Sequence, residues 1–133
     1  AHISPEESFI VCDAARAAGV KKLVVTHPEW GVVDMSIEDQ KKIVKDYDVL
    51  LERCYAQNMG GGKYKSNLPE NLEVIQEVGY KNVLISTDGG QTENPHWELA
   101  MQEYLQYLSD HGIPDEQIYY MSHTLAAGLL GIE

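Results

Sequence analysis

The stretch SPEESFIVCDAARAAGVKKLVVTHP, residues 4–28, decides the fold class because it holds one complete helix–strand unit. Ser4 and Glu7 form the pattern of a capping box, and Pro5 fits the first turn of a helix. Gly19 is a typical helix stop. The segment therefore predicts a helix, and its helical spacing predicts a buried stripe made of Ile10, Ala14, Ala17 and Ala18.

A short apolar run follows that helix. Lys22-Leu-Val-Val-Thr26 is rich in β-branched residues and ends at His27-Pro28. Runs of this kind form strands, and an apolar run without alternation is typical of a strand that is buried on both faces.

The same helix–strand order recurs twice further along the chain. A second helix is predicted from Ser36, with a strand at 48–51 that ends in Glu52. A third helix is predicted from Asn67 to Gly79, with a strand at 82–87 that ends in Asp88. Two further helices are expected near residues 95–110 and 114–130.

This alternation predicts an α/β fold of parallel strand–helix repeats with right-handed crossovers. Three parallel strands cannot close a barrel, and as an open sheet they leave two bare edges. We therefore expect a missing partner, which is either an absent N-terminal segment or a second copy of the chain, and we expect self-association. The alternative is a small, complete three-layer domain.

Composition excludes several classes of partner. The net charge of the 133 residues is −11 and the pI is about 4.7, so the chain should repel nucleic acid and anionic membrane surfaces. No apolar run reaches the roughly 20 residues that a membrane-spanning helix needs. Cys12 and Cys54 lack CxxC spacing and lie in apolar segments, which predicts free thiols in a reducing, cytoplasmic compartment.

Polar residues stand where the predicted strands end. His27, Glu52 and Asp88 follow the three strands, and His2 lies where a preceding strand would end. The carboxyl ends of parallel strands are where α/β folds collect functional groups. For Asp88 alone, a turn-capping role is an equally good interpretation. For Glu52, the alternative is a structural ion pair with Arg53.

The ordered set of motifs resembles a known family. His2-Ile-Ser-Pro-Glu-Glu7, Val24-Val-Thr-His-Pro28 and Ile85-Ser-Thr-Asp-Gly89, with a closing Ala127-Gly-Leu-Leu-Gly131, resemble the last four units of the amidohydrolase superfamily of (β/α)8 barrels. The resemblance implies that residues 1–133 are the C-terminal half of a TIM barrel, about units 5–8. It implies a hydrolase that activates water on a divalent metal to cleave a C–N or C–O bond in a small-molecule substrate.

Residue roles follow from that resemblance by position. His2 and His27 would be metal ligands, and Asp88 would be both a ligand and the catalytic acid–base. Imidazoles with a carboxylate suit zinc first, with manganese or iron as alternatives. The family's first-strand His-x-His pair and its fourth-strand ligand have no counterpart here, so the chain supplies only part of a metal site.

Three further residues are candidates for binding substrate. Trp30 could form an aromatic wall or pack under a loop, and Glu52 lies at the predicted rim. Lys63 belongs to the glycine-rich segment 57–67, which we interpret as a disordered connector. This segment follows a strand and would lie on the catalytic face, where the Lys63 ammonium group could meet an anionic group of the substrate. Two other functions stay open: a metal-dependent decarboxylase on the same scaffold, and a non-catalytic α/β binding module.

Overall fold

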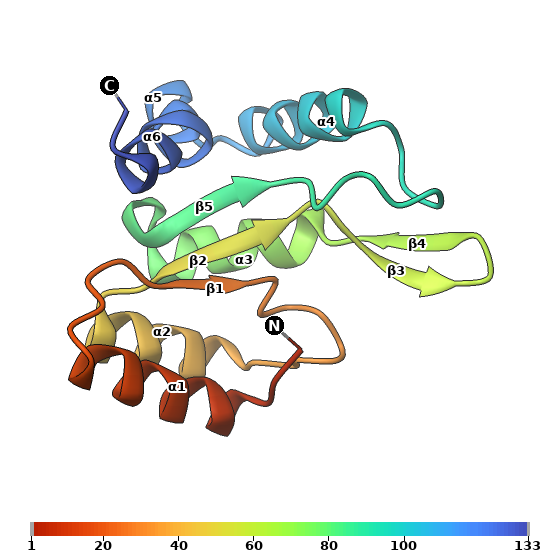
Figure 1. Cartoon of the computed structure of the whole chain (residues 1–133). Coiled ribbons are helices and arrows are strands. Elements are labelled where there is room, and N and C mark those ends of the chain that lie inside the picture. Colours follow the sequence, from red (N-terminus) through yellow and green to blue (C-terminus); the bar gives the residue numbers. More distant parts are fainter. Residues whose placement is uncertain (1, 133) are drawn as a thin grey trace.

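The computed structural model describes residues 2–132, and their helices and strands alternate along most of the chain (Figure 1). The order is α1 (Pro5–Ala17), β1 (Val24–Thr26), α2 (Ile37–Tyr47), β2 (Leu50–Cys54), β3 (Ala56–Gly60), β4 (Lys63–Ser66), α3 (Leu68–Val78), the 3-10 helix η1 (Tyr80–Asn82), β5 (Val83–Ser86), α4 (Trp97–Asp110), α5 (Asp115–Tyr119), the π-helix η2 (Tyr120–Thr124) and α6 (Leu125–Leu130).

The central sheet has three parallel strands in the order β1-β2-β5, as the repeated units predict. Thr26, the last residue of β1, lies opposite Glu52, and the last residues of β2 and β5, Cys54 and Ser86, are partners at the same edge of the sheet. The prediction that the second strand ends in Glu52 is wrong, because the pairing with β5 continues for two further residues. The strands follow each other in space in the order in which they follow each other in the chain. This sequential order, with helical crossovers between the strands, is what the predicted repeats require.

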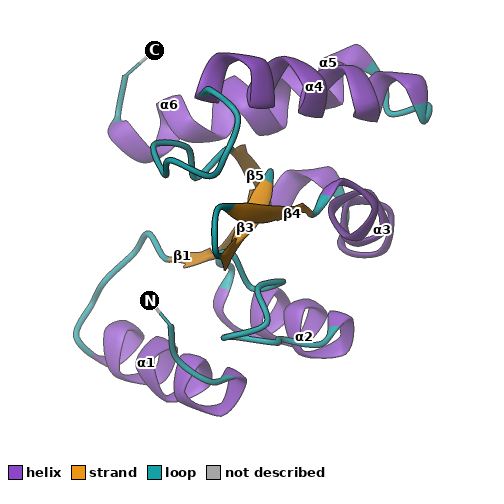
Figure 2. Cartoon of the chain, turned by 90° about the vertical axis from the view of Figure 1, so that its right-hand side faces the viewer, coloured by secondary structure: helices purple, strands orange, loops and turns teal. Residues whose placement is uncertain are grey.

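The helices surround one side of the sheet (Figure 2). On β2, Leu51 and Arg53 face these helices, and Arg53 bonds to Gln40 of α2 and Asn71 of α3. Alternation along a strand places Glu52 on the opposite face, where Thr26 of β1 donates a hydrogen bond to it. The sheet therefore has a helix-covered face, where Arg53 is buried between α2 and α3, and a second face that carries Thr26 and Glu52.

The helix signals in the sequence are confirmed. The Ser4 side chain accepts a hydrogen bond from the Glu7 backbone N–H at 3.2 Å, and the Glu7 carboxylate accepts one from the Ser4 N–H at 2.8 Å. Helix α3 ends at Gly79, whose φ of 95° is open to glycine at low cost. These boundaries depend on local chemistry alone, which is why sequence reasoning finds them.

Two burial expectations are wrong. The stripe predicted to be buried in α1 is exposed, with Ile10 66% accessible, and Ser8 and Cys12 face inward instead. Strand β1 is an edge strand whose Val24 is 40% exposed, because β2 is its only neighbour among the described strands. The exposure of β1 follows from its position at the edge of the sheet, and α1 packs through the face that carries Ser8 and Cys12.

Residues 56–66 are a β-hairpin, which corrects the prediction of a connector. β3 and β4 pair antiparallel, and Gly60, Gly61 and Gly62 all have positive φ at the turn. Strand β2 also begins later than predicted, because Asp48 caps α2 in the left-handed conformation (φ 49°). The hairpin extends beyond the carboxyl end of β2 (Figure 1).

Three expectations concern the chain as a whole. The strands of residues 2–132 form no closed barrel, as their number predicts. Cys12 and Cys54 are free and buried, as predicted. No described helix combines the length and the apolar character that crossing a membrane requires.

Candidate functional site

The residues that end β1 and β5 lie at the same edge of the sheet. His27 directly follows β1, and its backbone N–H extends the ladder by donating to the Glu52 carbonyl at 2.8 Å. Asp88 follows β5 after one further residue, Thr87. The parallel register therefore places the candidate groups of two strands at one rim.

His27 is held in an unusual conformation. Its φ is 41°, a left-handed value that a non-glycine residue adopts only when its surroundings enforce it. A residue before proline usually adopts an extended conformation, but here the chain reverses at His27 into a turn closed by Trp30 N–H donating to the His27 carbonyl. The side chain is 6% exposed, and its buried Nδ1 has no hydrogen-bond partner among the described residues.

Three aromatic rings gather at this position. The Trp30 ring stacks on His27 with centroids 4.4 Å apart, and the His2 ring lies 5.1 Å from His27 and 6.0 Å from Trp30. Trp30 is itself 7% exposed. It stacks on the imidazole of His27 and is buried, which fits the packing role considered from the sequence; the role of an aromatic wall for substrate stays a prediction.

Asp88 shares this electrostatic environment. Its φ is 49°, so both strand-end residues have left-handed backbones. Burial raises the pKa of Asp88; the charge of Glu52 raises it further, while His27 and His2 lower it. Burial lowers the pKa of His27, and the charge of Asp88 opposes this. The four side chains therefore influence one another, which connects the predicted residues of β1, β2 and β5.

Glu52 is not paired with Arg53. The two residues are neighbours on β2 and point to opposite faces, and Glu52 instead accepts a hydrogen bond from the Thr26 hydroxyl at 2.8 Å. The structural ion pair that we considered is thus absent from the described residues, and Glu52 stays on the face that carries the cluster.

Arg53 has a different partner, which the sequence reasoning missed. Its side chain is 1% exposed and lies 3.4 Å from the carboxylate of Glu29, which is 4% exposed. The other Glu29 oxygen accepts a hydrogen bond from the Cys54 backbone N–H at 3.1 Å. Glu29 stands between His27 and Trp30, so this buried ion pair anchors the turn that presents both rings.

Arg53 also anchors the far end of the loop that carries His27 and Trp30, residues 27–36. Gln40 donates from its amide nitrogen to the Met35 carbonyl at 2.8 Å, and its amide oxygen accepts from Arg53 at 2.8 Å. Arg53 therefore links both ends of loop 27–36. No pattern around Arg53 or Glu29 marks this pairing in the sequence, because the two residues lie on separate segments of the chain and meet only in the fold.

Lys63 lies apart from the cluster. It is exposed at the start of β4, toward the hairpin turn (Figure 1). The base of the hairpin, not its turn, meets the loops of the site. The substrate-binding role of Lys63 stays a prediction.

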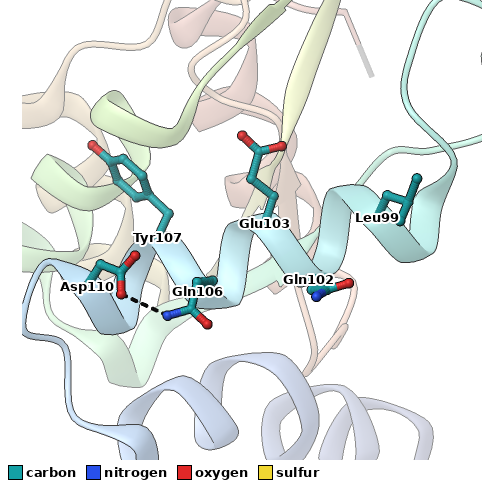
Figure 3. Close-up of a pocket in the computed structure, with 6 residues that line it drawn as sticks. All are labelled: Leu99, Gln102, Glu103, Gln106, Tyr107 and Asp110. Atoms are coloured by element: carbon teal, nitrogen blue, oxygen red, sulfur yellow. Dashed lines mark hydrogen bonds between the residues drawn. The ribbon is translucent and has the colours of Figure 1, made fainter.

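A groove on the outer face of α4 is separate from this site. It has a volume of about 330 Å³ and is lined by Leu99, Gln102, Glu103, Gln106, Tyr107 and Asp110 (Figure 3). Glu103 accepts a hydrogen bond from the Tyr55 hydroxyl, and Gln106 donates to Asp110. Three of its polar side chains are thus already engaged, and none of its lining residues belongs to the candidate site.

Replacing His27 by glutamine is expected to flatten the dependence of stability on pH below about 6.5. Because burial lowers the pKa of His27, the unfolded chain takes up a proton before the folded chain does. The free energy of unfolding of the unmodified protein should therefore fall as the pH drops from about 6.5 toward the lowered pKa. Asp88 and Glu29 have raised pKa values and act in the opposite direction at lower pH.

Urea denaturation at pH values of about 7.5 and 5.5, on either side of the usual pKa of histidine, measures this difference. His96→Gln is the matched control, because the side chain of His96 is 64% exposed. Equal pH dependence in the two variants would contradict the assignment to His27.

The fold and the cluster together define an α/β protein with two histidines and two carboxylates at the carboxyl rim of a parallel sheet. Among residues 2–132, no three His, Cys, Asp or Glu side chains are arranged to hold a metal ion. A family described as "Family of unknown function (DUF6282)" matches residues 1–52, which include His2, His27 and Trp30. No curated protein and no solved structure matches the chain.

Proposed function

We propose that the chain is the C-terminal half of an amidohydrolase-type (β/α)8 barrel and forms part of a metal-dependent hydrolase. The sequential parallel order β1-β2-β5, with helices surrounding one side, supports units 6–8 of such a barrel, with α1 as the helix of unit 5. The face opposite the helices would then line the barrel interior.

One observation carries the proposal. The rings of His2 and His27 lie 5.1 Å apart at the rim where Asp88 also acts, and these are the residues that the resemblance assigns to the site. The buried Nδ1 of His27 has no partner among the described residues, as expected of a nitrogen available to a metal. Imidazole and carboxylate are ligand types that zinc binds, with manganese or iron as alternatives, although the three side chains are not arranged as a ligand set among the described residues.

The roles of the residues follow from their surroundings. A divalent ion held by His2 and His27 would lower the pKa of a bound water molecule toward about 7. The raised pKa of Asp88 makes its carboxylate a better proton acceptor and, once protonated, a donor to the leaving group. Trp30 holds the His27 ring by stacking, and burial, assisted by the charge of Glu52, raises the pKa of Asp88.

The proposed site needs a partner, either an N-terminal half-barrel or a second copy. Strand β1 has a bare edge, and beside it a groove of about 130 Å³ between α1 and β1 is lined mainly by apolar residues. Val11 of α1, which lines this groove, is 53% exposed. A barrel strand beside β1 would cover this surface.

Produced by itself, the chain should therefore self-associate. Sedimentation velocity should show species larger than the 14.9 kDa monomer that grow with concentration. A single monomeric species throughout would contradict the bare-edge argument.

Metal analysis and kinetics of the full-length protein test the function. His27→Ala should lose most of the bound zinc, and Asp88→Asn should lower hydrolysis of amide or ester substrates by roughly 10²- to 10⁴-fold. His96→Ala is the control, since its side chain is 64% exposed. If the zinc content of His27→Ala is unchanged, His27 is not a metal ligand. Bound zinc with carbon dioxide release and no hydrolysis would favour a decarboxylase, and no metal at all would favour a binding module.

A further inference from the structure

The β3–β4 hairpin contacts both loops that carry the candidate site. Its base is closed by Asn67 N–H donating to the Tyr55 carbonyl at 2.8 Å, directly after β2. Loop 27–36 follows β1 and loop 87–96 follows β5, the strands on either side of β2. The hairpin therefore rises between the loop of His27 and the loop of Asp88.

Two consecutive residues of β3 make these contacts. Gln57 accepts a hydrogen bond from the Gly31 backbone N–H at 3.1 Å, next to Trp30. Asn58 donates from Nδ2 to the Gln91 side-chain oxygen at 2.8 Å and to the Glu93 carboxylate at 3.1 Å. Successive strand residues point to opposite faces, so neighbours can reach loops on the two sides of the hairpin.

The orientation of Asn58 is itself fixed. Its Oδ1 accepts a hydrogen bond from the Gly60 N–H at 2.7 Å, which leaves Nδ2 directed at loop 87–96. Gln57 likewise donates to Asn67 at 3.4 Å and keeps its oxygen for Gly31. Both side chains are half-buried, so substitution there should leave the core intact.

We propose that Gln57 and Asn58 are positioning residues, through which the hairpin sets the spacing between the His27–Trp30 turn and the Asp88 turn. This assignment rests on the proposed function, because the two turns matter for chemistry only if His27 and Asp88 belong to one active site. The hairpin then acts as a rigid spacer between two loops that make their own contacts to different helices and strands. A substitution of Asn58 should consequently change the surroundings of His27 and Trp30, which lie on the other side of the hairpin from loop 87–96.

A polarity swap tests the proposal. Asn58→Asp replaces the donor by a carboxylate. The Gln91 amide can rotate to donate to this carboxylate, but Glu93 can only repel it, so the variant loses the hydrogen bond to Glu93 and the repulsion should release loop 87–96. Adding Glu93→Gln supplies a donor from the other side and restores the hydrogen bond with its direction reversed. The carboxylate introduced by Asn58→Asp keeps the oxygen that the Gly60 N–H needs, so the single and double variants differ only in the contact between hairpin and loop.

Two readouts use the full-length protein and need no activity. Amide hydrogen exchange of residues 88–93 should become roughly three- to tenfold faster in Asn58→Asp, as the loss of about one hydrogen bond predicts. The NMR signals of the His27 ring and the Trp30 Nε1–H should shift in that variant and return in the double variant. Glu98→Gln, which removes an exposed carboxylate in the first turn of α4, is the control and should change neither.

Gln57 provides the second arm. Gln57→Leu removes the acceptor for Gly31 and should shift the Trp30 and Asp88 signals together, whereas Gln57→Glu keeps an acceptor and should shift them less. If Asn58→Asp alters only residues 91–93, or if Glu93→Gln fails to rescue it, the positioning role is wrong.

Zinc titration separates this inference from the function. If the His27 and Trp30 ring signals shift in Asn58→Asp and return in the double variant, but no variant binds zinc, the positioning role is supported and the metal site is wrong. Zinc affinity that falls in Asn58→Asp and recovers in the double variant supports both. If Asn58→Asp changes neither the zinc affinity nor the NMR signals of the His27 and Trp30 rings, the metal site is supported and the positioning role of the hairpin is wrong.

Discussion

Replacing Arg53 by methionine is expected to lower the free energy of unfolding by about 3–5 kcal/mol. Glu29 would keep a carboxylate in a position that is 4% exposed, without its positive partner. Gln40 and Asn71 would each lose a hydrogen bond, of 2.8 Å and 2.9 Å respectively. The effect is large because removing one member of a buried ion pair leaves the other charge uncompensated.

Urea denaturation of three variants isolates the cause. Arg53→Met combined with Glu29→Gln should regain much of the lost stability, because no buried charge remains at this pair. Lys41→Met is the control for a surface pair: Lys41 and Glu77 lie 2.6 Å apart with side chains 35% and 52% exposed, and such pairs contribute about 1 kcal/mol or less. If Arg53→Met and Lys41→Met have similar effects, the buried pair does not anchor loop 27–36.

Gly89→Ala should disturb the turn that presents Asp88 and lower stability by about 1–3 kcal/mol. A Cβ at residue 89 would lie 2.8 Å from the Trp97 Cβ and 3.3 Å from the Trp97 Cα. Both atoms are fixed to the first turn of α4, so neither can swing aside. Since Asp88 precedes Gly89 directly, relief of the clash should move the carboxylate from its place near His27.

Gly31→Ala is the matched control, because a Cβ there meets no atom within 4 Å. Urea denaturation should show a loss for Gly89→Ala only, and the NMR signal of the His27 ring should shift in that variant alone. An unchanged His27 signal in Gly89→Ala would mean that the turn absorbs the methyl group without moving Asp88.

Both predictions concern tertiary contacts that no local sequence pattern predicts. Arg53 follows a polar Glu52 and resembles a rim charge in the sequence, yet the strand directs it toward α2 and α3. Gly89 resembles part of a flexible Gly-Gly turn, yet close approach to α4 requires it. The same limit explains the hairpin: Ala56–Gly60 has no β-branched residue, so its pairing depends on β4 and on the neighbouring loops.

The sequence by itself determined the helix starts and stops, the three parallel strands, and the polar residues His27 and Asp88 beyond the carboxyl ends of β1 and β5. Capping, glycine stops and apolar runs act over a few neighbouring residues, so they can be identified before the chain folds. Only the tertiary structure decided which face of α1 is buried, that Glu29 pairs with Arg53, and that His2, His27 and Trp30 gather at one rim. Those outcomes depend on which elements meet and on where a neighbouring strand is missing, and contacts between distant residues alone set them.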